Sequence, residues 1–287
     1  MARYADHLIH VIGETRTPAE VVPKARALLA EAVALNPGSS EAHTALGTLY
    51  MQVDRDGGRA EAEYRQAIEL NPSDSKPRLE YAWLLRVLQR FQESREPASA
   101  AWEQDPLSYL ARISIAHNFG VGGDLASALP AVEKLVEDYP DNPVPRTLLA
   151  QNYCWSGRLE EARKALGPVA GYNDLLSRAT RAVVRALLGD PSEARSYLSD
   201  WETGRVTLQY SAARAALLYA AMGEKDRAPD LLKQDDREGP GLFWSVYQSR
   251  VFDEVRSDAR FVALLRAQKL PTTLGRALYR RPPDVAK

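Results

Sequence analysis

Four prolines divide the first half of the chain into units of nearly equal length. Pro37, Pro72, Pro106 and Pro140 follow one another at intervals of 35, 34 and 34 residues. The positions twelve residues before them carry small side chains: Ala25, Ala60, Ser94 and Ala128. The positions five residues before them are apolar: Ala32, Ala67, Ala101 and Leu135. A pattern that returns at one interval indicates a structural unit repeated along the chain.

A second series of positions has the same period and explains what the unit is. It consists of small residues, namely Gly47, Ala82, Ala116 and Ala150. Three residues after each comes a large apolar side chain: Tyr50, Leu85, Phe119 or Tyr153. Small residues let two helices cross closely, and large residues one turn away fill the remaining space. Each unit is therefore predicted to be a pair of antiparallel helices, and the proline ends the second helix.

This repeat resembles the tetratricopeptide repeat (TPR), whose period is about 34 residues. The resemblance is strong from about residue 25 to residue 170. It continues more weakly to about residue 232, where Gly189 and Gly223 precede an alanine at the spacing of Gly157 and Ala162. One hairpin cannot bury its apolar face alone, so neighbouring hairpins must stack. The resemblance implies an all-α fold, a right-handed superhelical solenoid of about seven hairpins with a C-terminal capping helix.

The predicted organisation is one solenoid over residues 1–271 and a basic tail over residues 272–287. Within the solenoid we expect an irregular first hairpin at 1–37, regular repeats at 40–170, degenerate repeats at 171–234 and a cap at 241–271. The first hairpin is irregular because a long connection runs through Glu14 to Pro18. The first degenerate unit has Asp174 where a proline was expected.

The far end of the chain carries a more specific resemblance. The stretch from Phe252 to Phe261, followed by Leu264 and Leu265, resembles the closing cap of one TPR subfamily. That subfamily often forms the C-terminal sensory half of bacterial winged-helix regulators, adenylyl cyclases and serine/threonine kinases. None of these output domains is found in the sequence. The resemblance implies either a free-standing TPR protein or the sensory part of a regulator.

Composition narrows the partners that the chain would bind. There are 37 Lys and Arg against 38 Asp and Glu, which gives a net charge of −1. Such a balance lacks the basic excess that nucleic-acid backbones and membrane surfaces attract, so neither partner is expected. The single cysteine, Cys154, allows no intramolecular disulfide and is compatible with a reducing compartment. No apolar run approaches the roughly 18 residues of a membrane span, and the first ten residues are too polar for a signal peptide. We therefore expect a cytoplasmic protein.

Catalytic and metal-binding motifs are missing from the sequence. It has no His-Glu-x-x-His, no Cys-x-x-Cys and no phosphate-binding loop, so no metal, no cofactor and no enzymatic activity are expected. Cys154 and His117 are the one conceivable pair of nucleophile and base, on first helices of adjacent units. A thiolate needs an activating environment as well, and a buried or groove-lining thiol is the favoured interpretation.

The TPR resemblance implies that the first helix of each hairpin lines the concave face. The central units would then offer an apolar stripe with a few polar groups, typical of binding sites. The predicted contact residues are Trp83, Arg86, Ile113, His117, Val121, Thr147, Gln151, Cys154 and Trp155. This composition favours a protein or peptide partner, and it also suits a small apolar ligand. The alternative, that Trp83 and Trp155 simply pack against neighbouring helices, stays open.

Three arginines form a separate stripe. Arg178, Arg181 and Arg185 are three and four residues apart, so they share one helix face. The repeat register directs that face toward the helix's own hairpin partner, where unpaired charge is unfavourable. Either the register slips and the arginines are solvated, which we favour, or they form a site for an anion or acidic peptide.

Three functions from different classes remain. The leading hypothesis is a non-catalytic scaffold that captures a protein or peptide in the concave groove. The alternative is a small-molecule-sensing module of a bacterial signalling or transcription system. The second alternative is an atypical enzyme on a TPR frame, for which Cys154 and His117 are the only candidate residues.

Overall fold

The regular elements of the protein are all helical in the part of the chain that the structure describes. The computed structural model describes residues 1–10, 18–167, 175–205, 211–237, 246–274 and 277–279. The helices are α1 (Ala2–His10), α2 (Pro18–Leu35), α3 (Ser40–Leu49), η1 (Tyr50–Asp54), α4 (Gly57–Leu70), α5 (Ser75–Val87), α6 (Arg95–Gln104), α7 (Tyr109–Gly122), α8 (Leu125–Asp138), α9 (Pro143–Trp155), α10 (Leu159–Leu166), α11 (Leu175–Leu187), α12 (Ser192–Glu202), α13 (Ser211–Met222), η3 (Lys225–Arg227), α14 (Ala228–Arg237), η4 (Arg250–Val255) and α16 (Ala259–Ala267).

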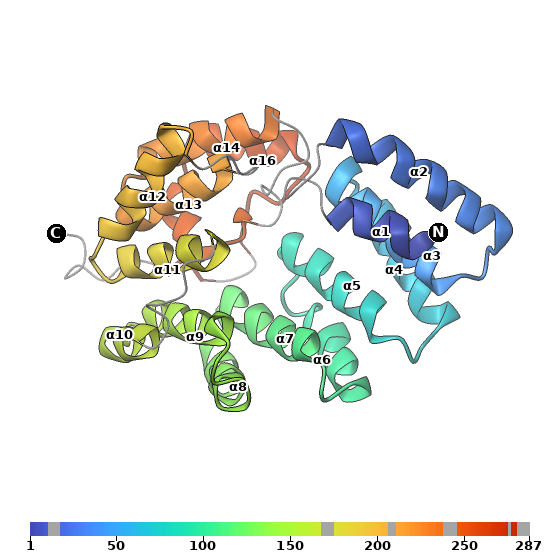
Figure 1. Cartoon of the computed structure of the whole chain (residues 1–287), viewed down its shortest axis with the longest axis horizontal. Helices are drawn as coiled ribbons and strands as arrows, with labels where there is room; N and C mark the ends of the chain where they lie inside the picture. The colour runs from blue at the N-terminus through green and yellow to red at the C-terminus, as the bar shows by residue number, and fades with distance from the viewer. Residues whose placement is uncertain (11–17, 168–174, 206–210, 238–245, 275–276, 280–287) are drawn as a thin grey trace.

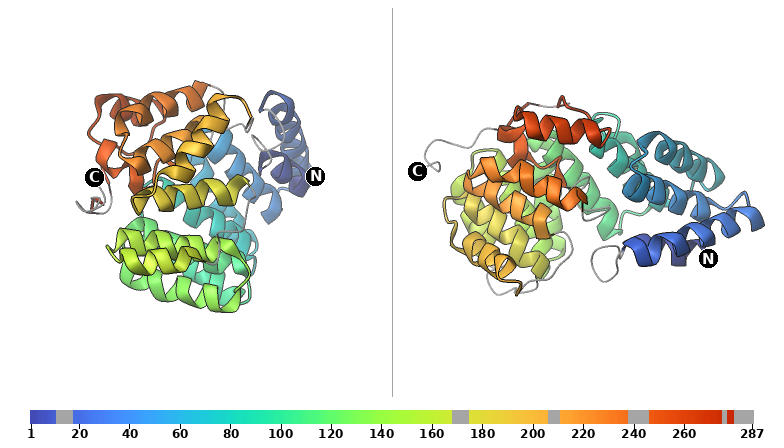
Figure 2. Two further views of the ribbon diagram at one scale, coloured as in Figure 1. Left: turned by 60° about the vertical axis from the view of Figure 1, so that its left-hand side comes forward. Right: turned by 90° about the horizontal axis from the view of Figure 1, so that it is seen from above.

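The described helices pair into seven consecutive hairpins, from α1/α2 to α13/α14, and α16 packs on α14. The odd-numbered helices from α1 to α13 also pack on one another and form an inner layer. Figure 1 looks along the axis of this stack, which winds around a central space with the even-numbered helices outside, and Figure 2 turns it. The predicted all-α, right-handed superhelical solenoid of about seven hairpins with a capping helix is confirmed.

The helix boundaries follow the prolines of the repeat. The outer helices α2, α4, α6 and α8 each end two residues before a repeat proline. Two residues after each proline stands a side chain that caps the next inner helix: Ser39, Asp74, Ser108 or Asn142. Each cap oxygen accepts a hydrogen bond from a backbone N–H of the first turn, at 3.0–3.2 Å. The capping satisfies N–H groups that have no partner inside the helix, so the turn is specified on both sides of the proline.

The small residues of both series lie where helices cross. Ala25, Ala60, Ser94 and Ala128 are fully buried, and so are Ala82, Ala116 and Ala150. Gly47 in α3 shows why size is restricted here. A Cβ added to it would lie 2.6 Å from Cε1 of Tyr64 on α4. Tyr64 is itself fully buried, and its hydroxyl lies 3.3 Å from the Thr48 hydroxyl, so the ring has little freedom to move.

Gly47→Ala is therefore expected to destabilise the fold, although alanine is the better helix former. Overpacking of this kind costs about 1–3 kcal/mol. Chemical denaturation of the two proteins measures the difference. Gly58→Ala in α4 is the matched control, because its added Cβ meets only Asp56 Oδ1, at 3.6 Å. Equal stability of the Gly47 variant and the wild type would show that the α3–α4 crossing is looser than described.

Several expectations lie outside the described residues. They concern the connection through Glu14, the irregular position Asp174, and the part of the basic tail at 275–276 and 280–287.

Candidate functional site

The concave groove is partly occupied by the chain's own C-terminal segment, residues 246–256. Tyr247 is fully buried, and its hydroxyl donates a hydrogen bond to the backbone oxygen of Val87 at the end of α5. The guanidinium of Arg250 lies over the ring of Trp155 on α9, 5.7 Å from its centroid. The segment therefore spans the inner layer between α5 and α9, which begin the third and the fifth hairpin. Figure 1 shows this segment, in orange to red, on the inner side of the surrounding helices.

Arg86 on α5 joins this segment to the inner helices. Its Nε donates to Oε1 of Gln248 at 3.0 Å, and Nη1 donates to Oδ1 of Asn118 at 2.8 Å. The residue is 8% exposed, and burial lowers the pKa of its guanidinium to about 10. It remains charged at neutral pH, and both of its hydrogen-bond acceptors are uncharged amides.

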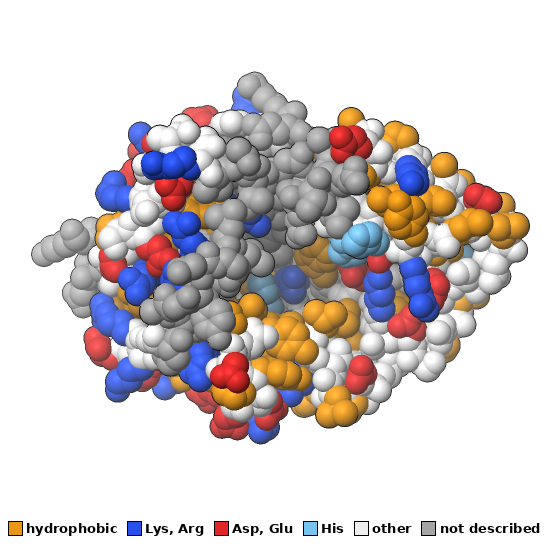
Figure 3. All heavy atoms as spheres, in the orientation of Figure 1, with side chains coloured by type: hydrophobic (Ala, Val, Ile, Leu, Met, Phe, Trp, Pro, Cys, Tyr) orange, Lys and Arg blue, Asp and Glu red, His pale blue; other side chains and the backbone are white. Residues whose placement is uncertain are grey.

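A cavity of 270 Å³ lies between the inner helices and the C-terminal segment. Four of the predicted contact residues line it: His117, Val121, Gln151 and Trp155. The other lining residues come from α11, α13 and the C-terminal segment: Ala179, Thr180, Val183, Arg214, Leu217, Val246, Gln248 and Ser249. In the space-filling view of Figure 3 the centre of this face is hollowed, and hydrophobic and basic side chains lie at its floor.

His117 presents a neutral imidazole to the cavity. Burial, together with the smaller effect of the positive charge of Arg86, lowers the pKa of its ring to about 3. A neutral imidazole offers one donor and one acceptor nitrogen.

This pKa predicts a pH dependence of stability. Between the ordinary value of 6.5 and about 3, the unfolded chain binds a proton that the folded chain excludes, so stability falls as the pH decreases. A fully shielded ring would lose about 1.36 kcal/mol of unfolding free energy per pH unit in this range. Because the His117 ring faces a cavity, we expect a smaller loss of about 1–2 kcal/mol between pH 6.5 and 4.5. Urea titrations of the wild type and His117→Gln at pH 7.5 and 4.5 isolate this contribution from other groups. An acid loss of the same size in both proteins would contradict it.

The remaining predicted contact residues are less accessible than expected. Trp83 and Ile113 are half-buried and pack against the core. Thr147 is buried, and its hydroxyl donates to the backbone oxygen of Pro143 at 2.9 Å. Cys154 is fully buried among core residues and does not line the cavity. Burial disfavours a thiolate, so the position of Cys154 suits a structural thiol.

The arginine stripe points where the repeat register directs it, so the favoured expectation of a solvated face is wrong for its central member. Arg181 is buried, and its Nε donates to both carboxylate oxygens of Glu193 on α12, at 2.9 and 3.0 Å. Arg178 lies 3.4 Å from Asp200, and Arg185 lies 3.4 Å from Asp190. Carboxylates of the same hairpin thus occupy the positions that an external anion was expected to take.

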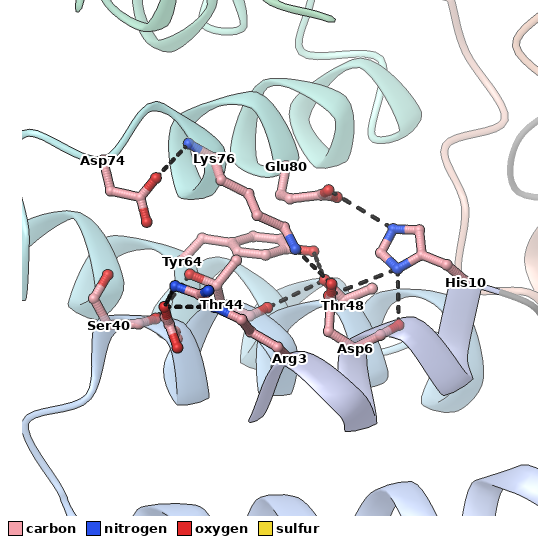
Figure 4. A network of polar contacts seen from close by, with 11 residues as sticks. Arg3, Asp6, His10, Ser40, Thr44, Thr48, Tyr64, Asp74, Lys76 and Glu80 are labelled. Atoms are coloured by element: carbon pink, nitrogen blue, oxygen red, sulfur yellow. Dashed lines mark hydrogen bonds and ion pairs between the residues drawn. The ribbon is translucent and has the colours of Figure 1, made fainter. Parts of the chain in front are cut away.

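A polar cluster closes the N-terminal end of the groove (Figure 4). Lys76 on α5 lies 2.5 Å from Asp6 on α1, and His10 lies 3.9 Å from Glu80. Burial raises the pKa of the Glu80 carboxyl above its ordinary value. These contacts join α1 to α5, while α1 also packs on α3, where Thr48 is fully buried. The first hairpin therefore covers the inner helix that follows it.

Several cavity residues were not predicted from the sequence. Arg214, Val183 and Leu217 lie on α11 and α13, in the degenerate repeats where the proline spacing is lost. Gln248 and Ser249 come from the segment before the cap, which carries no repeat pattern. The cap motif from Phe252 onward contains no signal that the residues before it enter the groove.

The described residues contain no cluster of three or more His, Cys, Asp or Glu side chains suited to a metal ion. Within the same part of the chain, no helix has the length and apolar character needed to cross a bilayer.

Comparison with known proteins agrees with the helical repeat. Residues 122–179 match the family described as tetratricopeptide repeat. The cellulose synthase operon protein C of Pseudomonas fluorescens (strain SBW25) is 30% identical over 154 residues, which are 49% of this chain. The match covers 12% of that protein's length. The fold is thus a tetratricopeptide-repeat solenoid.

Three solved structures are similar to the chain in fold. Pseudomonas aeruginosa PilF is 20% identical, with a TM-score of 0.49 over 86% of this chain and 98% of that one. PilW, described as a type IV pilus biogenesis factor, is 15% identical, with a TM-score of 0.49 over 92% and 98%. YrrB, described as a TPR protein with an unusual peptide-binding site, is 16% identical, with a TM-score of 0.42 over 76% and 96%.

Proposed function

We propose that the protein is a non-catalytic scaffold that captures a protein or peptide partner in its concave groove. Proteins built of tetratricopeptide repeats generally act as protein-interaction scaffolds. The observation that best supports the proposal is the piece of polypeptide that the groove already holds, residues 246–250 of the same chain. Arg86 binds its Gln248 side chain, and the Val87 carbonyl accepts a hydrogen bond from Tyr247.

The groove contacts this segment with the residue types that dominate protein interfaces. Arginine and tryptophan are enriched among the residues that contribute most to binding energy. Arg86 and Trp155 contact the C-terminal segment, through Gln248 and Arg250 respectively. Trp83 is half-buried on the same helix as Arg86. A partner would bind beside the segment or replace it. We place this function in the cytoplasm, which is compatible with the single buried thiol.

Replacement of Trp83 or Trp155 by alanine is expected to weaken partner binding by at least tenfold, because buried aromatic anchors are typical hot spots. Peptides selected from a random library against the wild-type protein provide the ligands, and fluorescence anisotropy gives their affinities. Far-UV circular dichroism and thermal unfolding establish that each variant is folded.

Trp102→Ala is the matched control, because Trp102 lies on the outer helix α6 and is 45% exposed. Its affinity for the selected peptides should equal that of the wild type. Undiminished binding by both folded inner-helix variants would rule out the concave groove as the capture site.

The second candidate is a small-molecule-sensing module of a bacterial signalling or transcription system. The cavity supports it, since ligand pockets are mostly apolar with a few orienting polar groups. The resemblance of residues 252–265 to the cap of sensory TPR regions points in the same direction.

A further inference from the structure

The cavity between the inner helices and the C-terminal segment has largely apolar walls in the part of the chain that the structure describes. Its apolar surface comes from Val121 and Trp155, from Val183 and Leu217, and from Val246. None of the described residues that line it is an aspartate or a glutamate. Of the described lining residues, Arg214 on α13 alone carries a permanent charge. The walls therefore favour an apolar body, and the charge favours a negative group.

Among the described residues, Arg214 has no acidic partner. Within the described residues no carboxylate lies within ion-pairing distance of it, and its described neighbour is the phenol of Tyr197. A second cation, Arg86, lies close enough to His117 to lower the pKa of that ring. Arg86 is bonded to the amides of Asn118 and Gln248. Glu80 also acts on Arg86 electrostatically, and burial raises the pKa of the Glu80 carboxyl.

Neutral hydrogen-bond donors at the cavity also lack an acceptor among the described residues. The indole Nε1–H of Trp155 is buried and has no hydrogen-bond partner among the described residues. The amide of Gln151 makes no hydrogen bond within the same part of the chain. A buried donor without an acceptor costs about 1–3 kcal/mol. Together with Arg214, these groups would be satisfied by one ligand that carries acceptor oxygens.

We propose that this cavity binds a small organic anion, a flat apolar group that carries one carboxylate. The carboxylate would pair with Arg214, and the apolar group would pack against Trp155 and Leu217. The volume of 270 Å³ equals that of about nine waters in the liquid, so the ligand has on the order of ten non-hydrogen atoms. This inference rests on the second candidate function and adds the ligand's chemistry. It leaves the capture of a protein partner as a separate activity.

Val246, Gln248 and Ser249 form one wall of the cavity, and Gln248 is bonded to Arg86. A bound anion would therefore contact both the solenoid and the segment that fills its groove. Occupancy of the cavity would stabilise the segment in place, because a ligand stabilises the state that binds it.

The test uses the full chain and two probes of one shape, hydrocinnamate and its neutral amide. Isothermal titration calorimetry at pH 7.5 should show the acid binding at least tenfold more tightly than the amide. Arg214→Gln should remove this preference and leave the amide's affinity unchanged, which also shows that the pocket is folded. Arg214→Lys should retain part of the preference. Arg195→Gln is the charge-matched control, because Arg195 is 64% exposed and pairs with Glu224 outside the cavity.

Two further measurements test whether the probes bind in this cavity, and whether the carboxylate belongs to a small molecule or to a peptide end. Val183→Phe fills the cavity and should abolish binding of both probes. A tetrapeptide that ends in phenylalanine carries the same chemistry at a chain end, and it should bind more weakly than hydrocinnamate. Equal affinity of the acid and the amide, or a preference that survives Arg214→Gln, overturns the proposal. Tighter binding of the tetrapeptide overturns the small-molecule source. Peptide capture that persists without hydrocinnamate binding leaves the scaffold function standing and removes only this site.

Discussion

Glu193→Gln is expected to lower the free energy of unfolding by about 3 kcal/mol, although the two side chains have the same shape. Removing one partner of a buried ion pair costs about 3–5 kcal/mol, because the other charge stays buried without its counter-charge. Glu193 on α12 is the carboxylate of Arg181, whose side chain is only 7% exposed, and it also lies 3.5 Å from Arg185. Urea denaturation followed by circular dichroism measures the change.

The surface pair between Glu160 and Arg163 provides the control. Their side chains are 77% and 47% exposed, and exposed ion pairs contribute about 0–1 kcal/mol. Glu160→Gln should therefore change stability little. An Arg181→Met, Glu193→Leu double variant should recover much of the loss, because it removes both charges. A Glu193→Gln protein as stable as the Glu160→Gln protein would refute a desolvated pair in the α11–α12 hairpin.

The architecture could be predicted from the sequence because each repeat marks its own boundaries. The prolines end outer helices, and small residues mark the crossings, so the register of α3 to α9 follows from spacing alone. The same register correctly directed Arg181 toward its hairpin partner. The solvated-face prediction is wrong for Arg181 because its carboxylate partner, Glu193, lies twelve residues away on another helix. Helix periodicity shows on which face of a helix a charged side chain lies. It carries no information about which side chain of another helix packs against that face.

The candidate site was only half predictable for a related reason. His117, Val121, Gln151 and Trp155 lie on α7 and α9, inside the regular repeats, and all four line the cavity. Arg214 and the residues of the C-terminal segment reach the cavity through contacts between distant parts of the chain. The Arg86–Gln248 hydrogen bond, for example, spans 162 residues. Such a contact depends on the curvature of the whole superhelix, which local sequence patterns do not specify.

Phe252→Ala should cost about 3–5 kcal/mol, as is typical when a fully buried phenylalanine is truncated and leaves a cavity. Phe252 lies in η4, is fully buried, and its ring centroid is 5.9 Å from that of Phe261 on α16. Thermal and chemical unfolding measure the loss. Trp102→Ala, at an exposed aromatic residue of α6, should stay close to the wild type.

The position of Phe252 also predicts which helices of the Phe252→Ala variant unfold locally. In a solenoid each unit contacts its neighbours, so damage at one end lowers local stability there first. Hydrogen exchange of Phe252→Ala should therefore be accelerated in α14, η4 and α16, and little changed in α3 and α4. The segment that carries Tyr247 and Gln248 precedes η4 directly, so α5 should also lose protection near Val87, its contact with Tyr247. Uniform loss of protection through α3 and α4 would instead mean that the chain unfolds as one cooperative unit. Acceleration confined to α14, η4 and α16, with α5 unchanged, would mean that the C-terminal segment binds the groove independently of the cap that follows it.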